Sequence, residues 1–203
     1  MAVKDARTTS STIGLKDLVM AELTSDTEAG VTYDELQKVA GAIDAEISPE
    51  NSDPDISYAD DIEFDVVYPD PEITLKLTLA DLPIAIQEML FSNTVDDNGV
   101  LIRSADDKPK YFAVGFRSEK SNHTFRYVWL YKCRAKPITE KYGTKEGTTI
   151  NRQTPEVELT AVKRTYDGRY QAVADEGENG FTAEKAATFL TSVYTPVVSA
   201  SGT

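Results

Sequence analysis

The chain has 203 residues, of which 40% are hydrophobic, and this length and composition suit a single domain (residues 1–203) that buries a core without disulfide bonds. Acidic residues number 34 and basic residues 21, so the formal net charge is −13, which argues against a protein that grips a nucleic-acid backbone through clustered lysine and arginine. The sequence has neither an apolar run near the roughly 18 residues of a membrane span nor the basic-then-apolar start of a signal peptide. We therefore expect a soluble protein made in a cytoplasm.

The chain begins with a polar segment. Residues 1–14 are mostly small and polar, which predicts an N-terminal arm that is mobile until a partner orders it. The first apolar cluster follows and favours a strand at residues 18–24.

Three later strands share one pattern, an apolar face opposite a face with two carboxylates. They are predicted at residues 42–47, at residues 62–68 and within residues 150–163. Their carboxylates are, in chain order, Asp44 and Glu46, Glu63 and Asp65, and Glu156 and Glu158. Because side chains alternate across a strand, each pair is expected on the face turned away from the core.

The segment between the first two of these strands contains two prolines and no apolar pattern. We expect residues 48–59, which include Asp53 and Asp55, to form a long exposed loop. A further strand with four inward aliphatic side chains is predicted at residues 73–79.

The apolar period then changes to that of a helix. Asp81 is placed to cap it and Pro83 suits its first turn. One apolar stripe contains Leu82, Ile86, Met89 and Leu90. We expect one short helix packed on the sheet, followed by a brief strand at residues 100–103.

Residues 110–137 form the centre of the predicted sheet, with two strands joined by a turn at residues 118–122. In the first strand Phe112, Val114 and Phe116 share a face. In the second strand one face is aromatic, whereas Val128 and Leu130 occupy the other. The aromatic face consists of Phe125, Tyr127, Trp129 and Tyr131, and Cys133 is predicted to follow on it as a small buried hydrophobe. Either both faces are covered within the core, or one of them meets another chain.

The C-terminal third begins with a polar loop at residues 138–149 and ends in a C-terminal extension at residues 175–203. Between them, the pair Asp167-Gly168 predicts a tight hairpin that leads to a strand at residues 169–174, because this pair tolerates positive φ angles. The extension should start as a flexible acidic linker and continue as a helix capped by Thr182. The fold class we predict is therefore mainly β, an antiparallel β-sandwich with one packed helix and a C-terminal helix.

Residues for catalysis or metal binding are sparse. The only histidine, His123, lies in a predicted turn, and no phosphate-binding glycine loop is present. The acidic run at residues 53–65 lacks the spacing and the glycine of a helix-loop-helix calcium site. Glu156 and Glu158 could act as a glycosidase pair, although any amphipathic acidic strand places carboxylates in this way. We expect no catalytic residue, no metal and no cofactor. The alternatives are such a glycosidase and a carbohydrate-binding β-sandwich.

Several segments, taken together and in order, resemble one family. They are VTYDELQKVAGAIDAEISPE, LTLADLPIAIQEMLF, DNGVLIRS, AVGFRSEKSNHTFRYVWLYK, INRQTPEVELTAVKRTYDGRYQAVADE and KAATFLTSVY. This collinear set resembles the major tail protein, or tail tube protein, of siphophages and prophages of mainly Gram-positive bacteria. The tube proteins of contractile tails and type VI secretion systems are an alternative of the same class.

The resemblance implies a structural virion protein without enzymatic activity. Six copies would form a ring, and stacked rings would form a hollow tail tube through which DNA leaves the capsid. The implied partners are further copies of the chain and the tape measure, tail terminator and distal tail proteins, with DNA passing without specific binding. The protein would be located in the virion tail after synthesis in the host cytoplasm.

Two sets of residues are candidates for functional surfaces in such a tube. The six carboxylates of the three acidic strands are candidates for lining the channel, where an acidic wall would keep DNA sliding. Alternatively, these carboxylates keep the outer surface soluble. The candidates for contacts between subunits are Phe125, Tyr127, Trp129 and Tyr131 of the central strand and Asp53 and Asp55 of the long loop.

Overall fold

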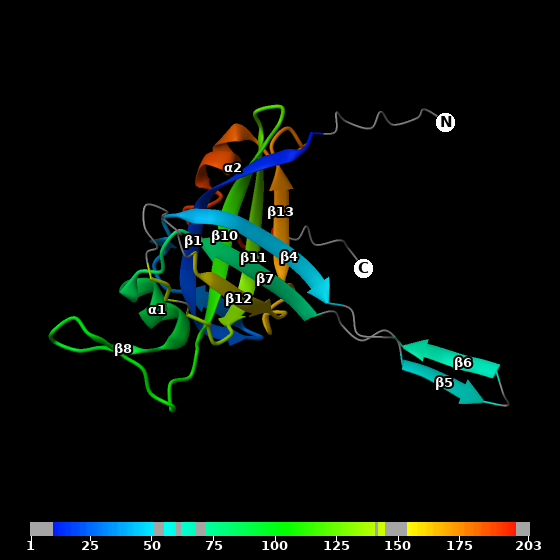
Figure 1. Ribbon diagram of the computed structural model, residues 1–203. Helices are drawn as coiled ribbons and strands as arrows, with labels where there is room; N and C mark the ends of the chain where they lie inside the picture. The colour runs from blue at the N-terminus through cyan, green and yellow to red at the C-terminus, as the bar shows by residue number, and fades with distance from the viewer. Residues whose placement is uncertain are drawn as a thin grey trace.

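The computed structural model describes residues 10–50, 55–59, 62–67, 72–140, 142–144 and 154–197. For residues 50, 55–59 and 62–67 it describes the backbone only. Figure 1 shows an antiparallel β-protein with two short helices, which confirms the predicted fold class. The elements are β1 (Thr12–Thr27), β2 (Gly30–Tyr33), β3 (Gln37–Lys38), β4 (Ala42–Glu50), β5 (Asp55–Ala59), β6 (Ile62–Val67), β7 (Glu72–Leu79), α1 (Ile84–Phe91), β8 (Thr94–Val95), β9 (Leu101–Ile102), β10 (Tyr111–Lys120), β11 (Phe125–Ala135), β12 (Glu156–Ala161), β13 (Gln171–Asp175) and α2 (Ala183–Thr188).

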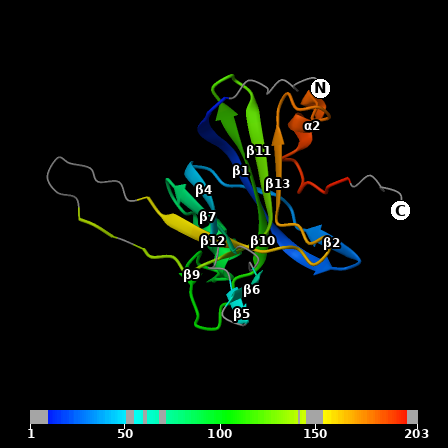
Figure 2. The same cartoon turned by 90° about the vertical axis from the view of Figure 1, so that its right-hand side faces the viewer.

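One large sheet supplies both layers of the sandwich. Its strands follow the order β2-β1-β10-β11-β12-β7-β4, with β13 added to β11 and β3 to β1. The long strands β1, β10 and β11 form one layer, and β12, β7 and β4 cross in front of them as the second (Figures 1 and 2). Strand β11 connects the layers, because its residues 126–130 pair with β13 whereas its residues 133–135 pair with β12.

The main core lies between the two layers, and helix α1 contributes to it. The predicted inward faces are buried, including Leu75, Leu77 and Leu79 of β7 and Val157 and Leu159 of β12. The apolar stripe of α1 is buried as predicted, but its cap is not the predicted one. Pro83 occupies the N-cap position, and Asp81 Oδ1 instead accepts a hydrogen bond from the backbone N–H of Leu82 at 2.8 Å.

A second apolar cluster covers the opposite face of the long strands and explains the two-faced pattern of β11. Trp129 and Tyr131 are fully buried there together with Ala113, and Ala186 and Phe189 of the C-terminal segment pack over them. Figure 2 places α2 on the side of β11 away from β4, β7 and β12. Both faces of β11 are therefore covered by the chain itself, as in the first of the two interpretations of this strand.

Two irregularities in register change which residues face the core. Between β10 and β11, Phe112 pairs with Cys133 and Val114 with Leu130, so that two residues of β11 face the single residue Ala113. This bulge moves Cys133 from the predicted aromatic face into the main core, where it is buried and where burial raises the pKa of its thiol. A second irregularity at the start of β4 leaves Ile43 53% exposed, although alternation predicted it to face inward.

Several predicted boundaries differ from the structure. Strand β1 already begins at Thr12, inside the segment expected to be an arm. Residues 11–14 lie beside the tip of the β10–β11 hairpin. Strand β10 extends to Lys120, beyond the predicted start of the turn. The prediction of a loop at residues 48–59 is wrong for residues 48–50, which end β4, and for residues 55–59, which form β5. Residues 51–54 lie outside the described part of the chain.

The Asp167-Gly168 turn is present but does not join a hairpin. Gly168 has a φ of 66°, as the Asp-Gly signal predicts, yet β12 and β13 each pair with β11 rather than with one another. Helix α2 is capped by the predicted Thr182, whose hydroxyl accepts from Lys185 N at 3.4 Å, but it spans only six residues. No helix in the described part of the chain is long and apolar enough to cross a membrane.

Candidate functional site

Four of the six candidate channel carboxylates lie on one face of the sheet. Strand β7 separates the two strands that carry them, with Asp44 and Glu156 on either side of Thr78 and Glu46 and Glu158 on either side of Lys76. Residues directly opposite one another in an antiparallel sheet point to the same side. Val157 and Leu159, which alternate with Glu156 and Glu158, lie in the main core, and Ala45 and Ile47 pack against it. This carboxylate face (Asp44, Glu46, Glu156 and Glu158) is therefore the outer face of the second layer.

The spacing of the carboxylate face follows from strand geometry. Neighbouring strands lie about 4.8 Å apart, so carboxylates on β4 and β12 are separated by roughly 10 Å across β7. The two members of a pair are about 7 Å apart along their strand. Glu72 extends the row, because its Oε1 accepts a hydrogen bond from Thr160 Oγ1 at 3.2 Å. The face is therefore a broad acidic surface and not a closed site.

Two lysines moderate the charge of this face. Lys136 Nζ lies 2.5 Å from Glu158 Oε1, and this hydrogen bond lowers the pKa of Glu158. Lys76 contributes more weakly to the same pKa shift from its position between Glu46 and Glu158. Asp44 and Glu156 have no ion pair among the residues that the structure describes, and both are exposed. The face therefore keeps a net negative charge.

The third acidic pair does not join this face. Glu63 and Asp65 belong to β6, which pairs with β5 in a separate two-stranded sheet that projects from the sandwich in Figure 1. Asp55 lies in β5 of the same hairpin, and Asp53 lies outside the described residues. The channel role of Glu63 and Asp65 and the interface role of Asp53 and Asp55 stay predictions.

Three of the four aromatic interface candidates are buried inside the subunit. Tyr127 is 3% exposed, and Trp129 and Tyr131 are fully buried, so they cannot form a subunit contact in this conformation. Trp129 Nε1 also donates a hydrogen bond to the backbone oxygen of Phe189 at 2.9 Å, which ties the C-terminal segment to β11. Phe125 alone keeps exposed surface, with the guanidinium of Arg117 4.4 Å from its ring centroid. Of the four aromatic candidates, only Phe125 can therefore meet another subunit in this conformation, and its interface role stays a prediction.

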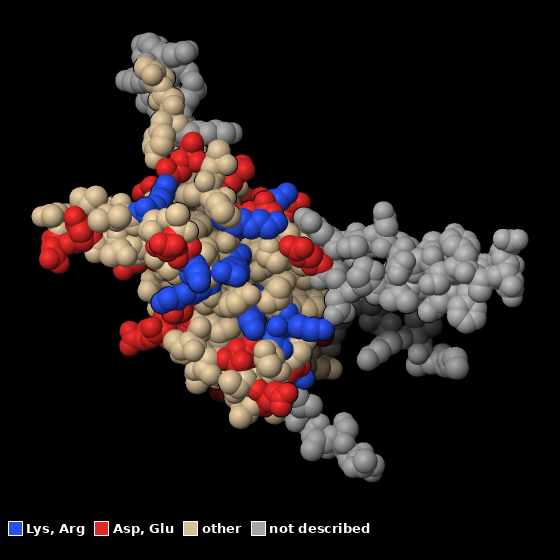
Figure 3. Space-filling view, turned by 90° about the horizontal axis from the view of Figure 1, so that it is seen from below, with Lys and Arg blue, Asp and Glu red and all other residues tan. Residues whose placement is uncertain are grey.

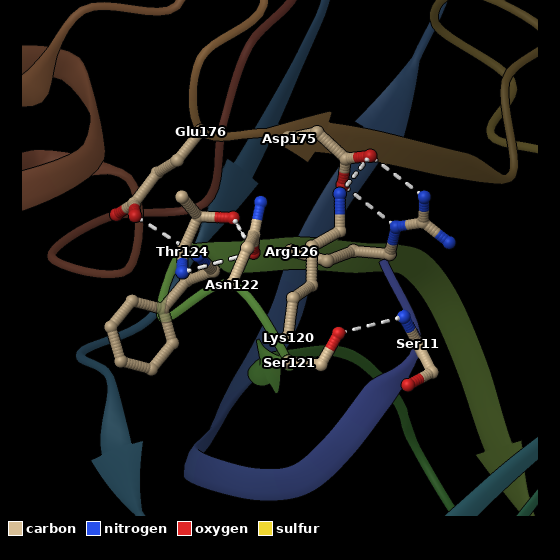
Figure 4. Close-up of polar contacts among 9 residues, drawn as sticks. Ser11, Lys120, Ser121, Asn122, Thr124, Arg126, Asp175 and Glu176 are labelled. Atoms are coloured by element: carbon tan, nitrogen blue, oxygen red, sulfur yellow. Dashed lines mark hydrogen bonds and ion pairs between the residues drawn. The ribbon is translucent and has the colours of Figure 1, made fainter. Parts of the chain in front are cut away.

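A polar junction that the sequence did not predict lies at the tip of the β10–β11 hairpin. Asp175 accepts hydrogen bonds at 2.7 Å from Lys120 and from Arg126, which lowers its pKa to about 2 (Figure 4). Glu176 accepts from Phe125 N at 2.9 Å, and Ser11 N donates to Ser121 Oγ at 3.2 Å. The beginning of the predicted acidic linker is therefore bound to the hairpin tip, as is the start of β1.

A second unpredicted network contains the buried Arg164. Its guanidinium forms an ion pair with Asp167, lies 3.7 Å from the ring centroid of Tyr131 and donates to the hydroxyl of Tyr33 at 3.3 Å. Nearby, Asp26 accepts from Lys132 Nζ at 2.6 Å and from the backbone N–H of Thr165 at 2.8 Å. These residues are far apart in sequence and belong to no motif, so only the fold reveals that they meet.

The geometry offers no support for the two alternatives from other classes. A glycosidase pair would face each other across a substrate, whereas Glu156 and Glu158 point the same way from one strand and Glu158 is bound to Lys136. A carbohydrate-binding platform would expose aromatic rings on a sheet face, whereas Tyr127, Trp129 and Tyr131 of β11 are buried. The exposed tyrosines of the described structure, Tyr142, Tyr166, Tyr170 and Tyr194, lie outside the strands. His123 is an exposed turn residue, as predicted.

A comparison with known protein families decides between the classes. Residues 7–197 match the phage tail tube protein family. The chain belongs to this family. No curated protein matches the sequence closely enough to add a relative. This tail tube protein is therefore a structural component of a bacteriophage tail, and its family points to a structural rather than an enzymatic role. The family also implies that it assembles with itself and with other tail proteins.

Proposed function

We propose that six copies of this tail tube protein form a ring and that stacked rings enclose the channel through which phage DNA is ejected. The partners are further copies of the chain, the tape measure protein inside the tube, and the tail terminator and distal tail proteins at its ends. DNA passes without specific binding. The protein is made in the cytoplasm of the host bacterium before it enters the virion tail. The host belongs to the mainly Gram-positive bacteria in which this family's phages and prophages occur. Family membership over nearly the whole chain supports this assignment.

The carboxylate face is the observation that carries the channel role. Four carboxylates of each subunit lie on one exposed sheet face, and a ring multiplies whichever face it turns inward. Duplex DNA carries one negative charge per about 1.7 Å of axis, so a basic wall would bind it by releasing counterions. An acidic wall repels DNA over a Debye length of about 8 Å at physiological salt, which keeps the duplex centred and sliding.

The ends of the sheet support assembly side by side. Among the described strands, β4 is the last of the second layer, and β13 pairs on one side only, with β11. An unpaired strand edge presents backbone N–H and C=O groups that can bind a neighbouring chain. Strand β4 also carries Asp44, Glu46, Pro49 and a register irregularity, features that restrain indiscriminate pairing. These edges are suited to a specific contact between subunits.

Electron microscopy of concentrated, purified protein tests the proposal. We expect rings of six subunits or stacks of such rings, with Asp44, Glu46, Glu156 and Glu158 on the wall of the bore. A protein that stays monomeric at every concentration, alone and in the presence of the terminator protein, contradicts the proposed assembly. A bore lined mainly by lysine and arginine contradicts the channel mechanism and leaves the assembly intact.

A further inference from the structure

The β8–β9 arm (residues 94–102) projects from the sandwich and exposes apolar side chains. In Figure 1 it extends to the left beyond α1. Val100 is 55% exposed and Ile102 is 50% exposed, and Ile84 of α1 is a third exposed aliphatic residue in this region of the chain. None of the arm residues belongs to the two apolar clusters of the described structure. The arm therefore adds nothing to the buried core of its own subunit, although Val95 and Leu101 are half-buried.

The arm is nevertheless held in one conformation by polar contacts. At its base, Arg103 binds Gln87 of α1 at 2.7 Å and Glu140 at 2.5 Å. At its tip, Asp96 Oδ1 accepts from the backbone N–H groups of Asn98 and Val100 at 2.9 and 2.8 Å. A two-stranded hairpin of this size is not stable in water by itself. Polar contacts that fix a hairpin while leaving its aliphatic side chains exposed are typical of an element preformed for a partner.

The charge of the arm identifies what the partner surface requires. Asp97, next to the tip, is exposed and has no hydrogen-bond or ionic partner among the described residues. Figure 3 shows acidic side chains at the end of the projection on the left. The complementary surface should therefore offer an unpaired cation beside an apolar or aromatic surface.

The chain carries such a surface at the start of β10 and the end of β11, the Tyr111 patch (Lys110, Tyr111, Lys132 and Arg134). Tyr111 is half-buried, and Lys132 Nζ and Arg134 Cζ lie 5.1 and 5.5 Å from the centroid of its ring. Lys132 is paired with Asp26 and Lys110 with Glu22. Arg134 is exposed and has no carboxylate partner within the described structure. Figure 3 shows lysine and arginine gathered in a band across this end of the molecule.

We propose that the β8–β9 arm of one copy docks on the Tyr111 patch of a second copy, with Asp97 against Arg134 and the aliphatic flank of the arm against the Tyr111 ring. Arm and patch are different surfaces, so the contact is heterologous: repetition closes a ring or continues along a stack. The inference rests on the proposed self-assembly, and it names the residues that drive that assembly.

Charge reversal tests this pairing. Asp97→Arg and Arg134→Glu each place like charges opposite one another, and we expect each variant to raise the critical concentration for assembly by at least about tenfold. A mixture of the two single variants should assemble again if the two variants alternate. The Asp97→Arg arm then docks on the Arg134→Glu patch, and the next contact pairs the native Asp97 with the native Arg134. The double variant should assemble as well, because each contact then pairs a reversed arm with a reversed patch. Sedimentation and electron microscopy measure both results.

The controls separate a lost contact from a lost fold. Glu184→Arg reverses an exposed carboxylate on α2, which lies at the other end of the subunit from the arm in Figure 1, and should assemble like the wild type. The near-isosteric variants Asp97→Asn and Arg134→Gln remove the pair with little risk to folding, and each should raise the critical concentration to a smaller extent. Circular dichroism establishes that every variant is folded.

The outcomes are distinguishable. Suppose that the wild type forms tubes. The docking proposal is then overturned, and the proposed function stands, if the folded single variants form tubes equally well. The same conclusion follows if neither the mixture nor the double variant recovers assembly. If the wild type forms neither rings nor tubes under any condition, the proposed function is overturned and the docking proposal with it.

Discussion

At the scale of single residues, Gly115 leaves no room for a larger side chain. A Cβ atom at this position would lie 2.7 Å from three indole carbons of Trp129. The indole cannot move away freely, because it is fully buried and its Nε1 is bound to Phe189 O. We predict that Gly115→Ala lowers the free energy of unfolding by about 1 to 3 kcal/mol, the usual range for overpacking a core.

Trp129 itself reports this change, because it is the only tryptophan of the chain. Urea unfolding followed by tryptophan fluorescence measures the stability of dilute, unassembled protein. Gly14→Ala is the matched control, since Gly14 also lies in a strand but a Cβ there meets nothing within 4 Å. Equal stability of Gly115→Ala and Gly14→Ala would mean that the sheet relaxes around the indole and that the close approach is not a constraint.

At the scale of elements, Asp26 joins β1 to the segment that precedes β13. Burial opposes ionisation of Asp26, but hydrogen bonds from Lys132 and from the backbone N–H of Thr165 and Tyr166 outweigh it and lower its pKa from 3.8 to about 2. A carboxylate with a lowered pKa stabilises the fold above its unfolded pKa and loses this contribution as the pH falls through its folded pKa. This shift corresponds to about 2 kcal/mol, present above pH 4 and lost towards pH 2.

We predict that Asp26→Asn destabilises the protein at pH 7 and makes its stability less dependent on pH between 4 and 2. Urea unfolding of the unassembled protein at pH 7, 4, 3 and 2 measures both effects. Glu28→Gln is the control, because Glu28 lies two residues away, is exposed and has no partner among the described residues. An Asp26→Asn protein that loses stability with acid as steeply as the wild type would assign the acid sensitivity to other carboxylates, first to Asp175, whose pKa is also lowered to about 2 by Arg126.

The buried faces of several strands could be predicted from the sequence, whereas bulges and strand pairing could not. Alternation located the cores of β7, β11 and β12, because burial of one face leaves a period of two in the sequence. It failed at Ile43 and Cys133, since a bulge changes the side of every later residue and leaves no local signal. The Asp167-Gly168 turn was predicted, but its strands pair with β11, a choice that depends on contacts distant in sequence.

For the candidate site, strand alternation predicted that each acidic pair shares a face, but not which pairs meet. The order β12-β7-β4 brings together Asp44, Glu46, Glu156 and Glu158 from strands that are far apart in the sequence. The same order leaves the pair on β6 outside the sheet. The buried Arg164 is another tertiary feature, because an arginine in a polar turn normally predicts exposure.

At the scale of the whole molecule, the distribution of charge matters more than the net value of −13. The carboxylate face is acidic and the Tyr111 patch is basic, and the two lie on different parts of the subunit. Only one of them can line a given surface of a tube. If the carboxylate face lines the bore, DNA meets a repulsive wall whatever the charge of the outer surface, because screening limits the interaction to about 8 Å.

We therefore predict that replacing Asp44, Glu46, Glu156 and Glu158 with lysine converts a tube that releases DNA into one that retains it. Retention should weaken steeply as salt rises, because binding to a basic wall is driven by counterion release. Binding of duplex DNA to assembled tubes at several salt concentrations, and ejection kinetics of phage that carry the variant, measure the effect. The control places the same number of lysines at Glu28, Glu35, Glu88 and Asp106, exposed positions away from this face. If the variant tubes and the control tubes retain DNA equally, the net charge of the protein and not the charge of the bore causes the retention. If neither retains DNA, the carboxylate face lies on the outside of the tube and keeps it soluble.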